Sequence, residues 1–204
     1  MAKDFLTDIK IIRRRARQHM EQGPVTPGYR GQLTTILRLL NEALATEIVC
    51  VLRYKRHFYM ASGIHAQSVA AEFLQHATEE QAHADEIAAR IVQLGGEPNF
   101  APQGLAERSH SEYVPGRDLI EMIEEDLVAE RVAIDSYGEM IRFIGDTDST
   151  TRRMLEGILA LEEEHADDLA NLLTTLGTKE KQLSGKAGAA ARPARAARKA
   201  GRRR

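Results

Sequence analysis

The chain has 204 residues, of which 43% are hydrophobic, 28% charged and only 5% aromatic, and it contains a single cysteine, Cys50. This length suffices for one domain with a sizeable core, and one cysteine excludes an intramolecular disulfide framework. The sequence has no recognisable signal peptide or membrane-spanning apolar run, so we expect a cytoplasmic protein with no membrane partner.

The formal net charge of −2 conceals an uneven distribution along the chain. Residues 1–32 carry seven basic and three acidic side chains, residues 33–177 carry eleven and twenty-six, and residues 178–204 carry ten and one. An acidic middle attracts cations, whereas basic ends attract polyanions. We therefore expect three parts: an N-terminal helix and linker (1–31), a helical domain (32–177) and a basic tail rich in Ala, Arg and Lys (178–204). The tail has no apolar periodicity and is predicted to be disordered.

A short amphipathic pattern opens the chain. Phe5, Ile9 and Ile12 recur at helical spacing within residues 4–20, and the basic run 13–17 follows. Two Gly/Pro pairs at 23–24 and 27–28 then interrupt the pattern. This segment fits either a docking helix on a hinge or the solvated end of a charged helix, and the sequence leaves both interpretations open.

Four long segments then carry apolar side chains at alternating intervals of three and four residues, the period that keeps one helix face toward a core. They span about residues 32–60, 67–94, 118–144 and 149–176, and Gly177 closes the last one. The connections between them are short, long (96–117) and short. Short connections form antiparallel hairpins, and a long one lets the second and third helices run parallel. The pattern predicts an all-α four-helix bundle with one long crossover.

Each of the four apolar faces contains one glutamate near its middle: Glu47, Glu80, Glu130 and Glu162. Mid-helix positions share one height in a bundle, so four carboxylates should converge at its centre. Such carboxylates are tolerated only when they are protonated or bound to cations, because burying them uncompensated is strongly destabilising. The intervals within the two pairs, 33 and 32 residues, indicate that each hairpin builds half of one site.

Two histidines extend this pattern, since His83 and His165 each follow a glutamate by three residues. A helical i, i+3 pair directs two donors toward one centre. Mixed oxygen and imidazole donors suit Fe(II), Mn(II) or Zn(II), and the absence of thiolates argues against a purely structural zinc site. A lone glutamate on an apolar face is usually a helix-edge residue, but six matched positions favour a metal site.

This arrangement, Glu then E-x-x-H, a crossover, then Glu and E-x-x-H, resembles the di-iron carboxylate pattern of the ferritin-like superfamily over residues 32–177. The spacing most resembles bacterioferritins and related bacterial ferritin-like proteins. The resemblance implies two iron ions per subunit. It implies that Glu47 and His83 bind one of them, that Glu130 and His165 bind the other, and that Glu80 and Glu162 bridge both. Tyr54 and Tyr137 resemble the tyrosines that surround the ligands in this family, with core tyrosines as the alternative.

The sequence departs from the bacterioferritin pattern in two respects. A methionine that ligates haem follows the second-helix glutamate in those proteins, and Gln81 stands there in this chain, so we expect no haem by this route. The short fifth helix of 24-subunit shells is weak or missing after Gly177. We expect a homo-oligomer, and because this helix is weak or missing, the number of subunits stays open between a dimer, a dodecamer and a 24-mer.

Further charged and polar residues lie beside the six predicted ligands. His76 is one turn before Glu80 and fits either an iron route or a core histidine. Several acidic residues are predicted to face outward, with an acidic inner surface as the alternative: Glu79, Glu163, Glu164, Asp167 and Asp168.

The basic tail resembles histone-H1-like tails and the extensions of DNA-protecting ferritin-like (Dps) proteins. Non-specific DNA binding requires neutralisation of phosphates, and the alternative is a tail that solubilises the protein or contacts a neighbouring subunit. The candidate DNA-binding residues are Arg192, Arg195, Arg198, Lys199, Arg202, Arg203 and Arg204.

Together these features predict an iron-binding ferroxidase that oxidises Fe(II) with O2 or H2O2 for iron storage, detoxification and protection from oxidative stress. One alternative is a DNA-binding, nucleoid-associated ferritin-like protein. Another is a rubrerythrin-like peroxidase or a manganese catalase, although the sequence lacks the C-x-x-C pair of a fused rubredoxin module.

Overall fold

The computed structural model describes residues 7–63 and 66–190, with side chains up to Leu176. This part of the chain is all-helical, as predicted, and contains no strand. Its four long helices are α2 (Leu33–Met60), α3 (Ala66–Gln93), α5 (Leu119–Ile144) and α6 (Ser149–Ala190). The shorter ones are α1 (Ile9–Arg15), the 3-10 helix η1 (Met20–Gln22) and α4 (Leu105–Arg108).

The starts of α5 and α6 follow from their capping residues. The Asp118 carboxylate accepts a hydrogen bond from the backbone N–H of Glu121 at 3.0 Å, and the Asp148 carboxylate accepts one from that of Thr151 at 3.0 Å. Each aspartate satisfies a donor that the first helical turn leaves free. The long helices begin within one residue of their predicted positions.

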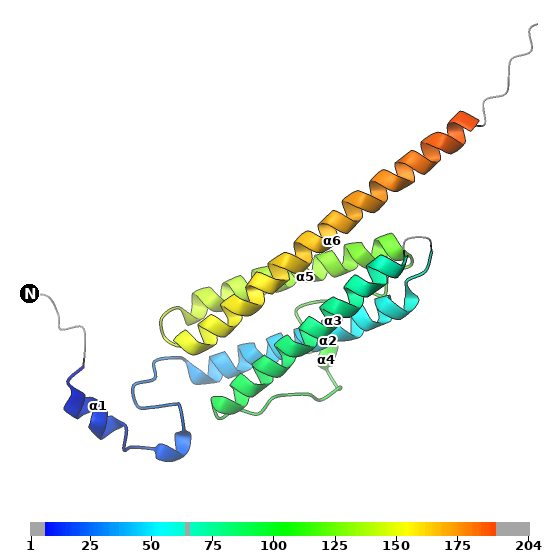
Figure 1. Cartoon of the computed structure of the whole chain (residues 1–204). Helices are drawn as coiled ribbons and strands as arrows, with labels where there is room; N and C mark the ends of the chain where they lie inside the picture. The colour runs from blue at the N-terminus through cyan, green and yellow to red at the C-terminus, as the bar shows by residue number, and fades with distance from the viewer. Residues whose placement is uncertain (1–6, 64–65, 191–204) are drawn as a thin grey trace, which may run out of the picture.

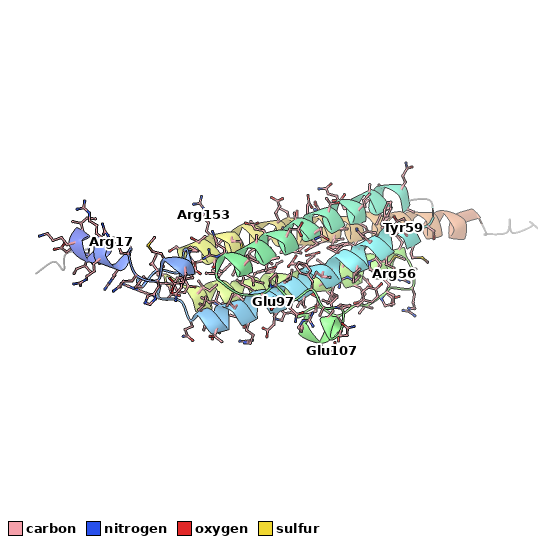
Figure 2. All side chains as sticks on the ribbon, turned by 90° about the horizontal axis from the view of Figure 1, so that it is seen from below. Arg17, Arg56, Tyr59, Glu97, Glu107 and Arg153 are labelled. Atoms are coloured by element: carbon pink, nitrogen blue, oxygen red, sulfur yellow. The ribbon has the colours of Figure 1, made fainter. Side chains whose placement is uncertain are left out.

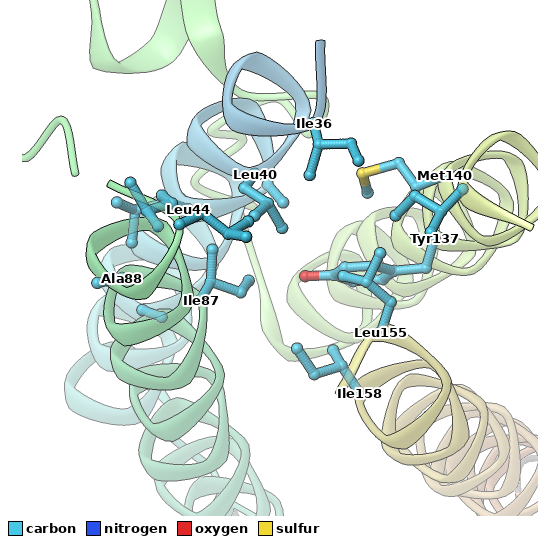
Figure 3. Packing of buried hydrophobic residues seen from close by; sticks show 14 of the residues in the cluster. Ile36, Leu40, Leu44, Ile87, Ala88, Tyr137, Met140, Leu155 and Ile158 are labelled. Atoms are coloured by element: carbon cyan, nitrogen blue, oxygen red, sulfur yellow. The ribbon is translucent and has the colours of Figure 1, made fainter. Parts of the chain in front are cut away.

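The four long helices form two antiparallel hairpins, α2 with α3 and α5 with α6, packed against each other (Figure 1). Apolar side chains from all four helices fill the interior in two clusters, one toward each end of the bundle. Figure 3 shows the first cluster, in which Leu44 and Ile87 face Leu155 across the interior. The carboxylates predicted to face the core lie between the two clusters, at the middle of the bundle.

The crossover between α3 and α5 is held against α2 by hydrogen bonds from α2 side chains. Arg53 donates to the Glu112 carbonyl at 2.9 Å, and Asn41 donates to the Glu97 carbonyl at 3.2 Å. Figure 2 shows α4, marked by Glu107, beside α2 on the outside of the bundle. This short helix was not predicted, because four residues are too few to give a periodic signal.

The fourth helix was predicted to end at Gly177, and this boundary is wrong. Helix α6 continues to Ala190 and projects beyond the other three long helices (Figure 1). A single glycine inside a helix costs only about 1 kcal/mol relative to alanine, and Lys, Glu, Gln and Leu, which all favour helix, follow it. The predicted tail residues from 191 onward lie outside the described residues.

The N-terminal segment contacts the bundle through Val25 and Tyr29, whereas no residue of α1 is buried. The Tyr29 hydroxyl donates to Asp148 at 2.8 Å, and Arg90 of α3 pairs with the same carboxylate at 2.9 Å. Asp148 thus joins the N-terminal segment, α3 and the start of α6.

Replacing Ile91 by Ala should lower the free energy of unfolding by about 2–5 kcal/mol, because the side chain is fully buried and its removal leaves a cavity. The neighbouring Val92 is 59% exposed, so Val92→Ala should stay within about 0.5 kcal/mol of the parent. Urea unfolding followed by circular dichroism measures both. Equal effects of the two changes would contradict the described packing of α3.

Candidate metal centre

The structure brings the six predicted ligand residues together at the middle of the bundle, and we call them the central cluster: Glu47, Glu80, His83, Glu130, Glu162 and His165. All six are buried, with at most 4% of any residue exposed. Each of the four long helices contributes one glutamate, and α3 and α6 each add a histidine. They converge because every glutamate lies on the inward face near its helix midpoint.

The donor atoms of the central cluster form two overlapping groups. One group takes an atom each from Glu47, Glu80, His83 and Glu162, and the other from Glu80, Glu130, Glu162 and His165. Within each group the donor atoms lie within 4.8 Å of one another. Glu80 and Glu162 belong to both groups. The geometry thus provides two adjacent four-donor sets with two shared carboxylates.

Both histidines direct Nδ1 toward the centre. His83 Nδ1 lies 3.1 Å from Glu162 Oε1 and 3.4 Å from Glu47 Oε2. His165 Nδ1 lies 3.3 Å from Glu80 Oε1 and 3.8 Å from Glu162 Oε2. Each imidazole therefore faces several carboxylate oxygens at once, as expected of a ligand that shares a cation with them.

The unsatisfied polar atoms of the protein are concentrated at this centre. Among the described residues, eleven buried side-chain nitrogen and oxygen atoms lack a hydrogen-bond partner, and eight of them belong to the central cluster. Buried polar groups without partners cost roughly 1–3 kcal/mol each. Carboxylate and imidazole donors in this number fit two divalent cations of the Fe(II) or Mn(II) type, which would satisfy these atoms.

Without metal, the centre retains protons. Burial and the charge of Glu80 raise the pKa of Glu47 to about 8 and raise that of Glu130 well above its usual range. Burial opposes protonation of the histidines, but the carboxylates close to each Nδ1 raise the pKa of His83 to about 12 and that of His165 to about 10. Metal binding should therefore release protons.

The shared carboxylates behave differently. Burial favours their neutral form, but the close approach of His83, His165 and a neighbouring glutamate lowers the pKa of both Glu80 and Glu162. The two groups common to both donor sets therefore keep their charge, while the protons of the centre reside on the outer ligands.

The two predicted tyrosines each contact a glutamate of the central cluster on the opposite hairpin. Tyr54 of α2 donates its hydroxyl proton to Glu130 of α5, and Tyr137 of α5 donates to Glu47 of α2. Figure 3 shows the hydroxyl of Tyr137 directed into the bundle interior. These reciprocal hydrogen bonds hold two carboxylates in place and tie the hairpins together at the height of the centre.

Glu79 was predicted to face outward, with an inner surface as the alternative, and its carboxylate contacts a histidine of the central cluster. Its Oε2 lies 2.8 Å from His165 Nε2, so the Nε2–H donates to Glu79 and Nδ1 is the ring nitrogen that faces the centre. Such outer carboxylates orient metal-binding histidines. His83 has no such partner on Nε2. In the sequence Glu79 is recognisable only as the neighbour of Glu80, and this position does not reveal where its side chain points.

The sequence did not predict a second set of buried polar residues, which surrounds Asp126. Asp126 lies between Arg53, at 2.8 Å from Nε, and His57, at 2.8 Å from Nδ1. His57 Nε2 also lies 3.1 Å from the Pro115 carbonyl. The three side chains and the Pro115 carbonyl join α2, α5 and the crossover one helical turn from Glu130. The only sequence signal was an aspartate four residues before that glutamate.

His76 occupies a core position beside the centre. Its ring stacks on His165 with 4.0 Å between centroids, and its Nδ1 lies 3.2 Å from the Tyr54 hydroxyl. Burial and the neighbouring His165 lower the pKa of His76 to about 4. Burial together with the Asp168 and Glu79 carboxylates raises the pKa of Glu72, which faces His76 from the solvent side.

Comparison with known proteins agrees with this architecture. The family model of the ferritin-like domain matches residues 37–178 of this chain. The chain belongs to the ferritin-like family. Within this family, Bacterioferritin BfrA of Mycobacterium tuberculosis is 33% identical over 139 residues, which are 68% of this chain and 83% of that protein. The predicted superfamily and fold are thereby confirmed.

Solved structures give the same result for the ferritin-like fold. The bacterioferritin-related protein of Bacteroides fragilis, described as a dodecameric thioferritin, superposes with a TM-score of 0.72 at 31% identity, covering 75% of this chain and 92% of that one. The M. tuberculosis bacterioferritin gives 0.64 at 32% identity, covering 73% and 90%. Dps from Thermosynechococcus elongatus, at 21% identity and a TM-score of 0.66, shares the fold.

The remaining predictions fall outside the central cluster. Gln81, the residue in the position of a haem-ligating methionine, is exposed on α3 and donates to Asp85 at 3.0 Å. The candidate DNA-binding residues from Arg192 onward lie outside the described residues. Within the described part of the chain, no helix combines the length and apolarity needed to cross a membrane.

The metal-free protein should become less stable as the pH rises from 6.5 to 8. In this range Glu47, with a folded pKa of about 8, and His83 and His165, with folded pKa values of about 12 and 10, hold protons that the unfolded chain releases. Stability is therefore lost as the pH rises. Thermal unfolding of chelator-treated protein at the two pH values measures this loss.

Added Co(II) provides the control for this measurement. Because metal binding competes with those protons, the stabilisation by Co(II) should grow over the same pH range. A metal-free melting temperature that rises from pH 6.5 to 8 would contradict the described protonation of the centre.

Proposed function

We propose that the protein is a ferroxidase that binds two Fe(II) ions at the central cluster and oxidises them to Fe(III), for iron storage or detoxification. The observation that carries this proposal is the pair of overlapping donor sets that share Glu80 and Glu162. Two cations bound in this way lie next to each other, which suits a reaction that removes one electron from each. The bacterioferritin relatives support the same activity.

The reaction balances with either oxidant. Two Fe(II) release two electrons, which reduce O2 and two protons to H2O2, or H2O2 and two protons to two water molecules. In the proposed centre Glu47 and His83 bind one Fe(II), and Glu130 and His165 bind the other. Tyr54 and Tyr137 hold the two outer carboxylates through their hydroxyls. The apolar clusters on either side limit access of water to the ligands.

Storage of the product would also require a cavity between subunits, so a homo-oligomer is part of the proposal. Large apolar side chains exposed on the long helices support assembly, since such surfaces are costly in a monomer. They include Leu52, Val92, Val128 and Phe143, each at least 45% exposed.

Glu162→Gln should abolish the paired site while preserving side-chain volume. Anaerobic Fe(II) titration should show two ions per chain in the parent whose binding is lost in the variant, and the initial rate of Fe(III) formation after addition of O2 should fall by about 10-fold or more in the variant. Glu163→Gln, at the exposed neighbouring position, is the matched control and should behave as the parent. Unchanged stoichiometry and rate in Glu162→Gln would refute the ferroxidase proposal.

The same donors also suit Mn(II), and a manganese catalase or rubrerythrin-like peroxidase is the competing activity. Oxygen evolution from H2O2 by the Mn(II)-loaded protein, without net Fe(II) oxidation, would favour the catalase. Consumption of H2O2 with a reductant other than Fe(II) would favour the peroxidase.

As a second function we propose DNA binding through the basic tail. The observation in its favour is that residues 178–204 carry ten basic and one acidic side chain. Because phosphate neutralisation releases counterions, the affinity should fall steeply with salt. Several tails on one oligomer would bind with enhanced avidity.

Replacing the seven basic residues from Arg192 to Arg204 by Gln should eliminate the gel shift of duplex DNA at low salt. Gln at Arg13, Arg14 and Arg15, the basic run of α1, is the control for a general loss of positive charge. Equal shifts with the parent and the tail variant would show that the tail does not bind DNA.

A further inference from the structure

A second group of potential ligands lies between α3 and α6, outside the central cluster. It consists of Glu72, His76 and Asp168, whose donor atoms lie within 4.8 Å of one another. His76 is fully buried, the Glu72 side chain is 30% exposed, and Asp168 is exposed. The group therefore opens to solvent through its carboxylates and ends inside the protein at an imidazole.

The hydrogen bonds of His76 determine which of its nitrogens is free. The Tyr54 hydroxyl donates its only proton to Glu130, so its oxygen accepts at 3.2 Å from His76 Nδ1, which must carry the proton. Nε2 is then left with a lone pair. This atom is buried, has no hydrogen-bond partner and lies 3.5 Å from Glu72 Oε1.

A lone pair that faces a carboxylate oxygen is unfavourable unless a cation or a proton lies between them. A bound cation would satisfy Nε2 and offset the repulsion between the carboxylates of Glu72 and Asp168. The Tyr54–His76 hydrogen bond is also the type of contact that fixes the tautomer of metal-binding histidines.

The group breaks the internal symmetry of the bundle. The two hairpins repeat the same ligands, Glu80 with His83 and Glu162 with His165, so each residue near one pair has a counterpart near the other. The counterparts of Glu72, His76 and Asp168 are Met154, Ile158 and Glu86. Ile158 is buried in the apolar cluster. An apolar side chain thus suffices at that position for the fold, and the imidazole on the other side calls for a different explanation.

We propose that Glu72, His76 and Asp168 form a third divalent-cation site, distinct from the central cluster, that takes a first-row metal such as Fe(II) from solvent. One imidazole and two carboxylates suit such ions, with water completing the coordination. The site stands between solvent and His165, on which the His76 ring stacks. Its existence does not depend on whether the central cluster oxidises iron.

Metal binding to the full-length protein tests this proposal. Anaerobic titration of the metal-free chain with Co(II), followed by visible absorption and calorimetry, should give three equivalents per chain. Asp168→Asn and Glu72→Gln should each leave two, with loss of at least 10-fold in affinity for the third. Both changes lie at solvent-accessible positions, and circular dichroism checks that the variants fold.

Two control variants make the result specific. Glu86→Gln, the symmetry-related counterpart of Asp168→Asn, and Asp167→Asn, its exposed neighbour, should both retain three equivalents. Crystals soaked in Co(II) should show an anomalous peak between Glu72, His76 and Asp168. Two equivalents in the parent, or a third that survives both Asp168→Asn and Glu72→Gln, would overturn the third site.

The same titration separates failure of this site from failure of the proposed function. Two equivalents in the parent that weaken in Glu162→Gln would support the central cluster and overturn the third site. A single equivalent that Glu162→Gln leaves intact and Asp168→Asn removes would support the third site and overturn the paired centre.

Discussion

Four carboxylates are buried at one height in this helical bundle, and the structure depends on interactions that offset their mutual repulsion. Pairing with His83 and His165 offsets part of it, and retained protons on Glu47 and Glu130 offset more. Eight donor atoms still lack partners. A core that tolerates such a centre must obtain its stability elsewhere, and the two apolar clusters above and below the carboxylates provide that stability.

The two hairpins repeat one ligand pattern, but the ends of the bundle that they form differ. At one end the space beside the centre is filled by apolar side chains such as Met140 and Ile158. At the other end Asp126, with Arg53 and His57, ties α5 to α2 and to the crossover. This network is fully buried and hydrogen-bonded, so it fixes the position of the helices with geometric precision. Only this end also contains His76.

Much of this architecture was predictable because its signals are periodic. The interval of three and four residues located the long helices, and interruption of the apolar face at Glu47 and its three counterparts located the centre. Glu79 and the Arg53–Asp126–His57 network were not predictable, because their roles depend on side-chain direction and on contacts between distant segments. Helix α4 was too short for a periodic signal. The predicted end at Gly177 was wrong because local helix propensity on both sides outweighed the cost of one glycine.

The extension of α6 affects how the charges of the chain interact. At a rise of 1.5 Å per residue, the backbone at Ala190 lies about 20 Å along the helix axis from Leu176, whose side chain packs in the apolar core. The Debye length at physiological ionic strength is only about 8 Å. The helix therefore works as a rigid spacer, and a charge at its described end is screened from charges at the level of Leu176.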